Sequence, residues 1–230
     1  MALADDLKTD VQSIFRQQWT TRDGNVVPEP DDLRLTNDGV LLDGTVLYAD
    51  MDGSTKLVDG YNPDFAAEVY KAYLHCAAKV IRSDGGEITA YDGDRIMAVF
   101  VGGTMNTSAA RSALKINYCV REIINPLLKT QYPNTPYELR QTVGVDTSKL
   151  LVARTGVRGA NDLVWVGRAA NYAAKLTELG PEPSSWITGD VYDKLHESLK
   201  FTDGKAMWEK RLWTSMDKMA IYQSTWWWRV

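Results

Sequence analysis

The sequence predicts an α+β fold, a ferredoxin-like sandwich in which helices cover a mostly antiparallel sheet. Strand-like and helix-like stretches alternate in the order β-α-α-β-β-α-β between Thr45 and Leu199. The helical stretches repeat apolar residues at helical spacing, as helices that cover a sheet do. With 230 residues, 44% of them hydrophobic and 24% charged, the chain is long enough for one domain with additions.

Three parts are expected: an N-terminal helix with a connector in residues 1–44, the main α+β domain in 45–200 and a strand extension in 201–230. Apolar residues at helical spacing predict a helix from Leu3 to Trp19, which packs on its own domain or, as we favour, on a partner subunit. The polar stretch Thr20–Asp43 predicts a connector. Two aromatic-rich strands, Trp208–Trp213 and Met219–Thr225, are typical of a sheet edge or an interface, with base stacking by the tail as the less favoured alternative.

The first half of the domain begins with a buried strand at Val46–Ala49. Asn62 can cap a helix that begins at Pro63 and runs to Arg82. Gly85-Gly86 ends that helix and turns the chain. A hairpin then follows, with strands at Glu87–Tyr91 and Ile96–Val101 and a tight turn at Asp92-Gly93.

The second half begins with a helix predicted over Met105–Leu128, which Pro126 and the segment Tyr132–Pro136 should end. The later elements are, in order, strands at Leu139–Asp146 and Leu150–Arg154 around a short turn, a strand at Asp162–Val166, a helix at Gly167–Leu179 and a strand–helix unit from Ile187 to His196.

Carboxylates at a strand end give the first indication of function. Asp50 and Asp52 follow the strand Val46–Ala49, and Gly53-Ser54-Thr55 opens a loop before the next helix. Asp94 lies at the hairpin turn, next to the end of the strand that carries Asp50. Two such carboxylates can bridge divalent ions, and free backbone N–H groups of the loop can face a polyphosphate. The alternative is that acidic residues at a strand end serve only solvation.

Several motifs in sequence order make the chain similar to a known family. They are Tyr48-Ala-Asp-Met-Asp-Gly-Ser-Thr55, Gly85-Gly-Glu-Ile88, Tyr91-Asp-Gly-Asp94 and Val166-Gly-Arg-Ala-Ala-Asn-Tyr-Ala-Ala-Lys175. Over Thr45–Leu199 the chain resembles the class III nucleotidyl cyclase domain. Its N-terminal extension and Trp-rich tail most resemble the pyrimidine cyclases of the bacterial Pycsar antiphage systems.

The resemblance implies two divalent ions, Mn²⁺ or Mg²⁺, held by Asp50, Asp94 and the backbone carbonyl of Met51. Phosphates would lie on the loop formed by Asp52, Gly53, Ser54 and Thr55. Asn171 would orient the ribose. Lys175 takes the place of the family Arg that stabilises the transition state, and Lys149 the place of one that meets the terminal phosphates. Lys keeps the charge of Arg but loses its bidentate fork.

The residues that read purines in the family are absent. By counting from the motifs, the base-reading positions are Ala90 and Val164, which are small or apolar, and Tyr48 is a polar candidate. The resemblance therefore favours a nucleoside triphosphate substrate of the pyrimidine type, UTP before CTP. The alternatives are a conventional adenylate cyclase, or a catalytically degenerate domain used for binding or dimerisation.

The remaining expectations concern partners and location. Because the family draws its two half-sites from different subunits, the chain is expected to form a homodimer with composite sites and to signal to a separate effector that the cyclic nucleotide activates. The net charge of −4 implies no general affinity for nucleic acid or for membranes. No signal peptide or long apolar run is found, so we expect a cytoplasmic protein, with Cys76 and Cys119 as reduced core residues.

Overall fold

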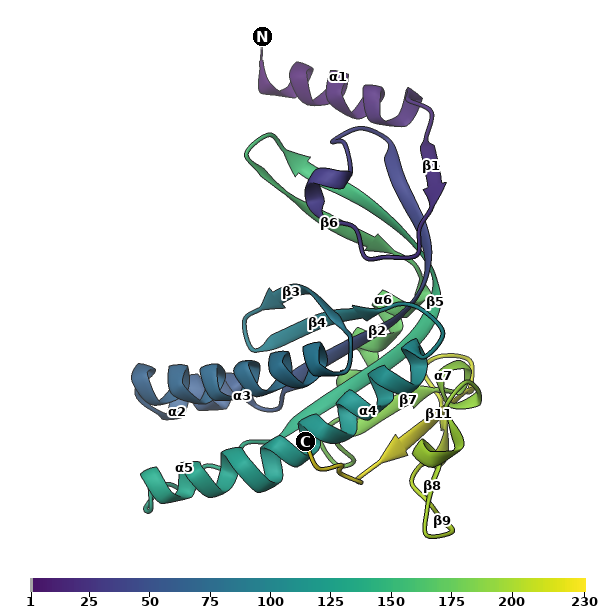
Figure 1. Cartoon of the computed structure of the whole chain (residues 1–230). Helices are drawn as coiled ribbons and strands as arrows, with labels where there is room; N and C mark the ends of the chain where they lie inside the picture. The colour runs from purple at the N-terminus through teal and green to yellow at the C-terminus, as the bar shows by residue number, and fades with distance from the viewer. Residues whose placement is uncertain (1) are drawn as a thin grey trace.

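One nine-stranded sheet organises the computed structural model, which describes residues 2–230 (Figure 1). The main strand order is β10-β11-β7-β5-β2-β4-β3, with β1 added to β2 and β6 added to β5. The predicted α+β class is confirmed. The strands are β1 (Thr20–Asp23), β2 (Asp38–Met51), β3 (Glu87–Asp92), β4 (Arg95–Phe100), β5 (Gln141–Val157), β6 (Ala160–Val166), β7 (Ser185–Thr188), β10 (Glu209–Trp213) and β11 (Met219–Ser224).

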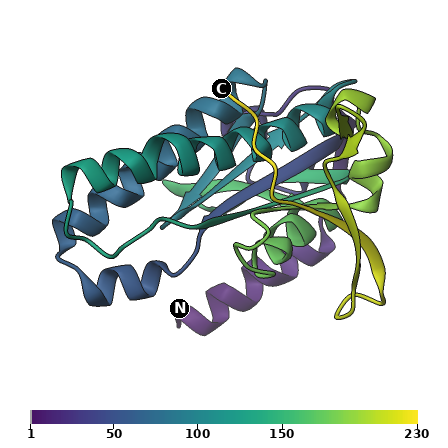
Figure 2. The same ribbon diagram turned by 90° about the horizontal axis from the view of Figure 1, so that it is seen from below.

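Helices lie on both faces of this sheet. Figure 2 shows α6 on one side and α3, α4 and α5 on the other. Side chains of β2 alternate accordingly: Leu47 and Ala49 join the large core under α3 and α4, whereas Val46 joins the core under α6. The helices are α1 (Leu3–Arg16), α2 (Ser54–Gly60), α3 (Pro63–Ser83), α4 (Met105–Tyr118), α5 (Asn125–Gln131), α6 (Arg168–Thr177) and α7 (Gly189–Asp193).

Strand β5 differs from its prediction, because no turn interrupts it. It runs for 17 residues and pairs with β2 from Gly39–Ala153 to Met51–Gln141. The stretch Thr147-Ser148-Lys149 looks like a turn in sequence because its residues are polar. In the structure the Thr147 hydroxyl is buried and accepts a hydrogen bond from Thr45 Oγ1 at 3.1 Å, so the polar side chain is satisfied within the sheet.

The prediction of a connector over Thr20–Asp43 is also wrong. Strand β1 pairs in parallel with the start of β2, and β2 begins at Asp38, so the expected boundary at residue 44 falls inside a strand. Within this segment Leu33, Val40 and Leu42 are buried. Residues 20–43 therefore form an arm of the sheet together with β6 and the end of β5 (Figure 1).

The helix α3 confirms the predicted signals. Asn62 Oδ1 accepts a hydrogen bond from the Phe65 N–H at 2.8 Å, which caps the helix behind Pro63. At the other end the Gly86 N–H bonds to Ile81 O, and Gly85 takes a positive φ of 84°, which is the Schellman arrangement. The short helix α2 was not predicted, because Gly-Ser-Thr is equally typical of a loop.

The long helix does not end at Pro126. It passes through a π-helical turn at Cys119–Ile124 and continues as α5 to Gln131. Pro126 lies in the first turn of α5, where its missing N–H is tolerated. The Tyr132–Pro136 segment then ends the helix as predicted.

The tail confirms the prediction of a sheet edge. Strand β11 pairs antiparallel with β7, and β10 pairs with β11. The last residues cross α4: the Trp228 N–H donates to Leu114 O at 3.1 Å, and Trp226 and Trp228 pack against the large core. A two-residue hairpin, β8 (Phe201–Thr202) with β9 (Lys205–Ala206), precedes these strands. None of the helices in residues 2–230 combines the length and hydropathy needed to cross a lipid bilayer.

Candidate functional site

The structure brings Asp50 and Asp94 to one corner of the sheet. Asp50 is the second-last residue of β2, and its partner across the ladder on β4 is Arg95, the neighbour of Asp94. Asp94 occupies the two-residue loop between β3 and β4 with Gly93, one position later than the predicted turn. The two carboxylates are close enough for the charge of Asp94 to raise the pKa of Asp50.

Burial is the largest influence on Asp50, and it raises the pKa of this carboxyl from 3.8 to about 6. The Arg95 guanidinium opposes this shift, with its Nε 3.7 Å from Asp50 Oδ2. The buried Tyr73 hydroxyl on α3 has no hydrogen-bond partner, and its pKa is raised by burial and then by the charges of Asp50 and Asp94. The corner therefore holds negative charge that the protein itself does not fully compensate.

This donor set fits a hard divalent cation. The predicted ligands are two carboxylates and the backbone carbonyl of Met51, the last residue of β2, and all are oxygen donors of the kind that Mg²⁺ and Mn²⁺ prefer. Within residues 2–230 no group of three or more His, Cys, Asp or Glu side chains could hold a metal. A bound ion would therefore depend on Asp50, Asp94, carbonyl oxygen and ligands from outside the chain.

The loop expected to bind phosphates follows directly. The Asp52 N–H donates to Arg140 O at 2.9 Å, and Gly53 takes a positive φ of 72° before Ser54 and Thr55 start α2. Arg140 Nε lies 4.0 Å from Asp52 Oδ2, with both side chains about half-exposed. Sequence reasoning missed Arg140, because a single Arg before a strand carries no signal until β5 is paired with the end of β2.

Lys149 is not brought to this loop within the chain. It lies opposite Asp43, whereas the residue opposite Asp50 is Thr142. Seven residues of extended strand separate Thr142 from Lys149, which is about 23 Å. Because that interval is odd, Lys149 also points to the other face of the sheet. Its role at the terminal phosphates stays a prediction.

Asn171 and Lys175 are both exposed on the outer side of α6. The inner side of the helix, with Ala169, Ala173 and Leu176, is buried against the sheet. The contact is close because β5 has a glycine there: a Cβ on Gly144 would lie 2.1 Å from Ala173 O. In a single chain the two predicted catalytic side chains therefore point away from the sheet that carries Asp50.

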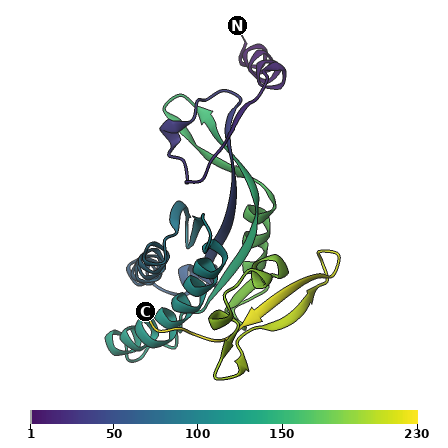
Figure 3. The ribbon, with the colours of Figure 1, turned by 45° about the vertical axis from the view of Figure 1, so that its right-hand side comes forward.

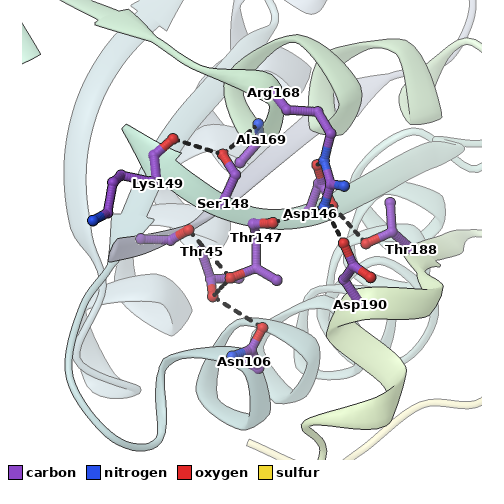
Figure 4. Close-up of polar contacts among 11 residues, drawn as sticks. Thr45, Asn106, Asp146, Thr147, Ser148, Lys149, Arg168, Ala169, Thr188 and Asp190 are labelled. Carbon is purple, nitrogen blue, oxygen red and sulfur yellow. Dashed lines mark hydrogen bonds and ion pairs between the residues drawn. The ribbon is translucent and has the colours of Figure 1, made fainter. Parts of the chain in front are cut away.

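An ionic network around the buried Asp146 fixes the start of α6 (Figure 4). Arg168 Nε donates to Asp146 Oδ2 at 3.1 Å, its NH2 group donates to Thr147 O at 2.9 Å, and it also pairs with Asp190 on α7. Asp146 is fully buried, which raises its pKa, and a 2.6 Å hydrogen bond from Thr188 Oγ1 is the largest opposing influence. Arg168, a basic residue of the helix motif, thus holds α6 on the sheet.

Of the three positions predicted to meet the base, the structure brings two together. Tyr48 pairs with Met97 on β4, and Met97 pairs with Ala90 on β3, so the three form one row across the sheet. This row is two residues before the Asp50 row and on the same face. Burial raises the pKa of Tyr48, and Arg95 opposes that shift. Val164 lies elsewhere, on β6 in the arm, opposite Ala153.

A bulge in β3 adds a residue that counting along the sequence could not place. The register shifts between Ile88, which pairs with Ala98, and Ala90, which pairs with Met97, so Thr89 is an extra residue between them. Thr89 Oγ1 lies 3.5 Å from Met97 O. The hydroxyl of Thr89 therefore lies next to the row of Tyr48 and Ala90.

Comparison with known proteins shows which family the chain belongs to. No protein-family model matches the chain. The chain is 52% identical over 231 residues to the uridylate cyclase of Xanthomonas perforans, and 52% identical over 232 residues to that of Burkholderia cepacia, with all of both chains covered in each case. The chain belongs to the uridylate cyclase branch of the class III nucleotidyl cyclases. The resemblance to pyrimidine nucleotide cyclases that was inferred from the motifs is thereby confirmed.

Solved cyclase structures share the fold. The guanylyl cyclase Cya2 matches with a TM-score of 0.70 and 19% identity, over 82% of this chain and 94% of that one. The adenylyl cyclase CyaB from P. aeruginosa matches with a TM-score of 0.64 and 19% identity, over 81% and 95%. Both matches therefore extend over about four fifths of this chain.

The raised pKa of Asp50 predicts a pH-dependent gain in stability for Asp50→Asn. Because the folded pKa of about 6 lies above the ordinary 3.8, ionisation destabilises the metal-free wild type as the pH rises through this window. The free energy of unfolding of Asp50→Asn relative to wild type should therefore increase from pH 4 to pH 6 and level off above. Urea unfolding without metal measures it.

The control for this experiment is Asp43→Asn, which removes an exposed carboxyl from the same strand. A stability difference for Asp50→Asn that stays constant between pH 4 and pH 8 would contradict the electrostatic account of the corner.

Proposed function

We propose that this cyclase converts UTP to 3′,5′-cyclic UMP and pyrophosphate at a site shared by two copies of the chain. The observation that carries the proposal is the meeting of Asp50 and Asp94 at one sheet corner in a chain related over its full length to uridylate cyclases. In the reaction the ribose 3′ oxygen forms a bond to the α-phosphorus, the bond from that phosphorus to the β-phosphate oxygen breaks, and the hydroxyl proton is released.

Asp50, Asp94 and the Met51 carbonyl would hold two divalent ions, Mn²⁺ or Mg²⁺. When bound, such ions lower the pKa of the attacking hydroxyl and neutralise the triphosphate. Arg140, beside Asp52, adds a fixed positive charge next to the loop that is proposed to receive the phosphates. The raised pKa of Asp50 supports this assignment, since an additional positive charge would relieve the cost of its burial.

A second copy would supply Asn171 and Lys175. Both are exposed on the side of α6 that faces away from its own sheet, so neither reaches Asp50 of the same chain. A head-to-tail pair related by a two-fold axis places α6 of each copy over the acidic corner of the other and forms two sites. Asn171 then orients the ribose, and Lys175 stabilises the charge that develops on the α-phosphate.

The proposed base site is the row of Tyr48 and Ala90, one step along the face from Asp50. Tyr48 is half-buried and presents a ring at this position, whereas Ala90 offers no side chain that reads a purine edge. The neighbouring Thr89 hydroxyl can donate to or accept from a uracil edge. CTP is the second candidate substrate.

The product would act in the cytoplasm on a separate effector in antiphage defence, as the resemblance implies.

Substrate choice is tested with the purified chain, Mn²⁺ and each of the four ribonucleoside triphosphates. We expect kcat/KM for UTP to exceed that for CTP, ATP and GTP by about tenfold or more. The reason is that the Tyr48 ring limits the space for a purine and the Thr89 hydroxyl can form a hydrogen bond with the uracil edge. Product identification by mass spectrometry is the measurement. A preference for ATP would replace the proposal with an adenylate cyclase, and turnover no higher than that of Asp50→Ala would indicate a degenerate domain.

The shared site predicts complementation between inactive variants. Asp50→Ala and Lys175→Ala should each lack activity, but an equimolar mixture should recover about one quarter of the wild-type rate, because half of the dimers are mixed and each has one intact site. The matched control is Asp50→Ala mixed with Asp94→Ala, since both changes affect the same half-site and no intact site can form. The shared-site arrangement fails if mixed dimers form and the first mixture stays inactive.

The positions of Arg140 and Lys149 predict different kinetic effects. Arg140→Ala should raise the KM for UTP by about tenfold with a smaller change in kcat, because a cation next to the phosphate loop is lost. Lys149→Ala should change KM less, since that side chain lies about 23 Å along β5 and on the other face. Steady-state kinetics measure both, and thermal melting confirms that the variants fold. The reverse order of effects would favour Lys149 as the phosphate ligand.

A further inference from the structure

The helix α1 exposes an apolar stripe that belongs to none of the hydrophobic cores of its own chain. Five residues of the helix form the stripe, and every residue of α1 is exposed. The exposed fractions are 73% for Leu3, 53% for Leu7, 46% for Val11, 56% for Ile14 and 83% for Phe15. Their spacing places them on one side of the helix. Such a contiguous stripe on a soluble domain is characteristic of an interaction surface.

The C-terminal end of the exposed helix is nevertheless tied to the arm. Asn37 is 9% exposed, and its side-chain amide donates to Ile14 O at 2.8 Å and to Gln17 O at 2.7 Å, which satisfies carbonyls at the end of α1. Strand β1 then continues the chain in parallel with β2, and Arg22 pairs with Asp38 at 3.2 Å. The protein therefore presents the stripe on a fixed support.

The arm carries α1 away from the rest of the molecule. Figure 3 shows the helix beyond the end of the β2–β5 arm, clear of the other helices. Figure 2 shows it on the side of the sheet that carries α6. That is the side to which Asp50 belongs, because Asp50 and Val46 share a face of β2 and Val46 packs in the core under α6.

We infer that the stripe of α1 docks on a second copy of this chain and forms an extension of the dimer interface. The inference rests on the proposed function: a second copy has to approach this face to bring Asn171 and Lys175 to Asp50. An arm that extends on the same side then reaches past its own domain and over the partner. Burying five apolar side chains would stabilise the dimer, so the composite site would depend on a helix that contains none of its residues.

The test compares the dissociation constants of two double variants of the full chain by sedimentation velocity. Leu7→Gln with Phe15→Gln removes apolar surface from the stripe. Lys8→Gln with Asp10→Gln changes polar positions of the same helix and keeps its net charge. We expect the first variant to weaken the dimer by about tenfold or more and the second to match wild type, because contact energy concentrates in large apolar side chains.

Circular dichroism should be unchanged in both variants, since no residue of α1 is buried in its own chain. The stripe variant should also lose cyclase activity at low protein concentration and regain it at high concentration. The inference is overturned if the stripe variant dimerises like wild type, which would indicate that the stripe serves a different protein or none. Because sedimentation requires no nucleotide, a wild type that dimerises through α1 but makes no cyclic UMP would overturn only the proposed function.

Discussion

The continuous pairing of β2 with β5 is the constraint on which the structure depends. From Gly39–Ala153 to Met51–Gln141 the two central strands keep one register, and both faces of the ladder are covered over most of its length. At one end this register puts Arg140 next to Asp52, and β4, on the other side of β2, adds Arg95 opposite Asp50. At the other end the same strands leave the body and become the arm. A slip of one residue would turn every side chain of β2 to the opposite face and separate the acidic corner from the face that carries α6.

Two charged clusters along this ladder are built in opposite ways. At Asp146 the protein supplies its own compensation, because Arg168 and Thr188 bond to the buried carboxylate and Thr147 O accepts a further bond from Arg168, which fixes α6. At Asp50 the compensation is incomplete: burial raises the pKa most and the charge of Asp94 adds to it, and the Arg95 guanidinium, the largest opposing influence, stays 3.7 Å away. A satisfied buried network makes a position rigid, whereas an acidic corner with incomplete compensation is suited to bind cations.

The helices α6 and α1 show a similar contrast between parts that are packed and parts that stay exposed. The inner side of α6 packs so closely that only a glycine fits opposite Ala173, while its outer side leaves Asn171 and Lys175 in solvent. The arm likewise buries Leu33 and Val40 yet leaves every residue of α1 exposed. Surfaces that are held rigidly but stay exposed are what a site assembled from two copies requires, since preorganised groups lose little entropy when the copies meet.

The sequence by itself determined the α+β class, the family, the cap of α3 at Asn62 and the pair Asp50 and Asp94, because each rests on local signals: periodicity, capping residues and short motifs at strand ends. It could not determine that Thr147-Ser148-Lys149 lies within a strand, that Thr20–Asp43 joins the sheet or that Thr89 forms a bulge. Those outcomes depend on partners far along the chain. The contacts of Arg140 and Arg168 are non-local too. Arg140 meets Asp52, and Arg168 meets Asp146, only after distant strands have paired. Tertiary structure alone decided these points, because hydrogen bonding across a sheet and burial between elements are non-local interactions that no short stretch of sequence encodes.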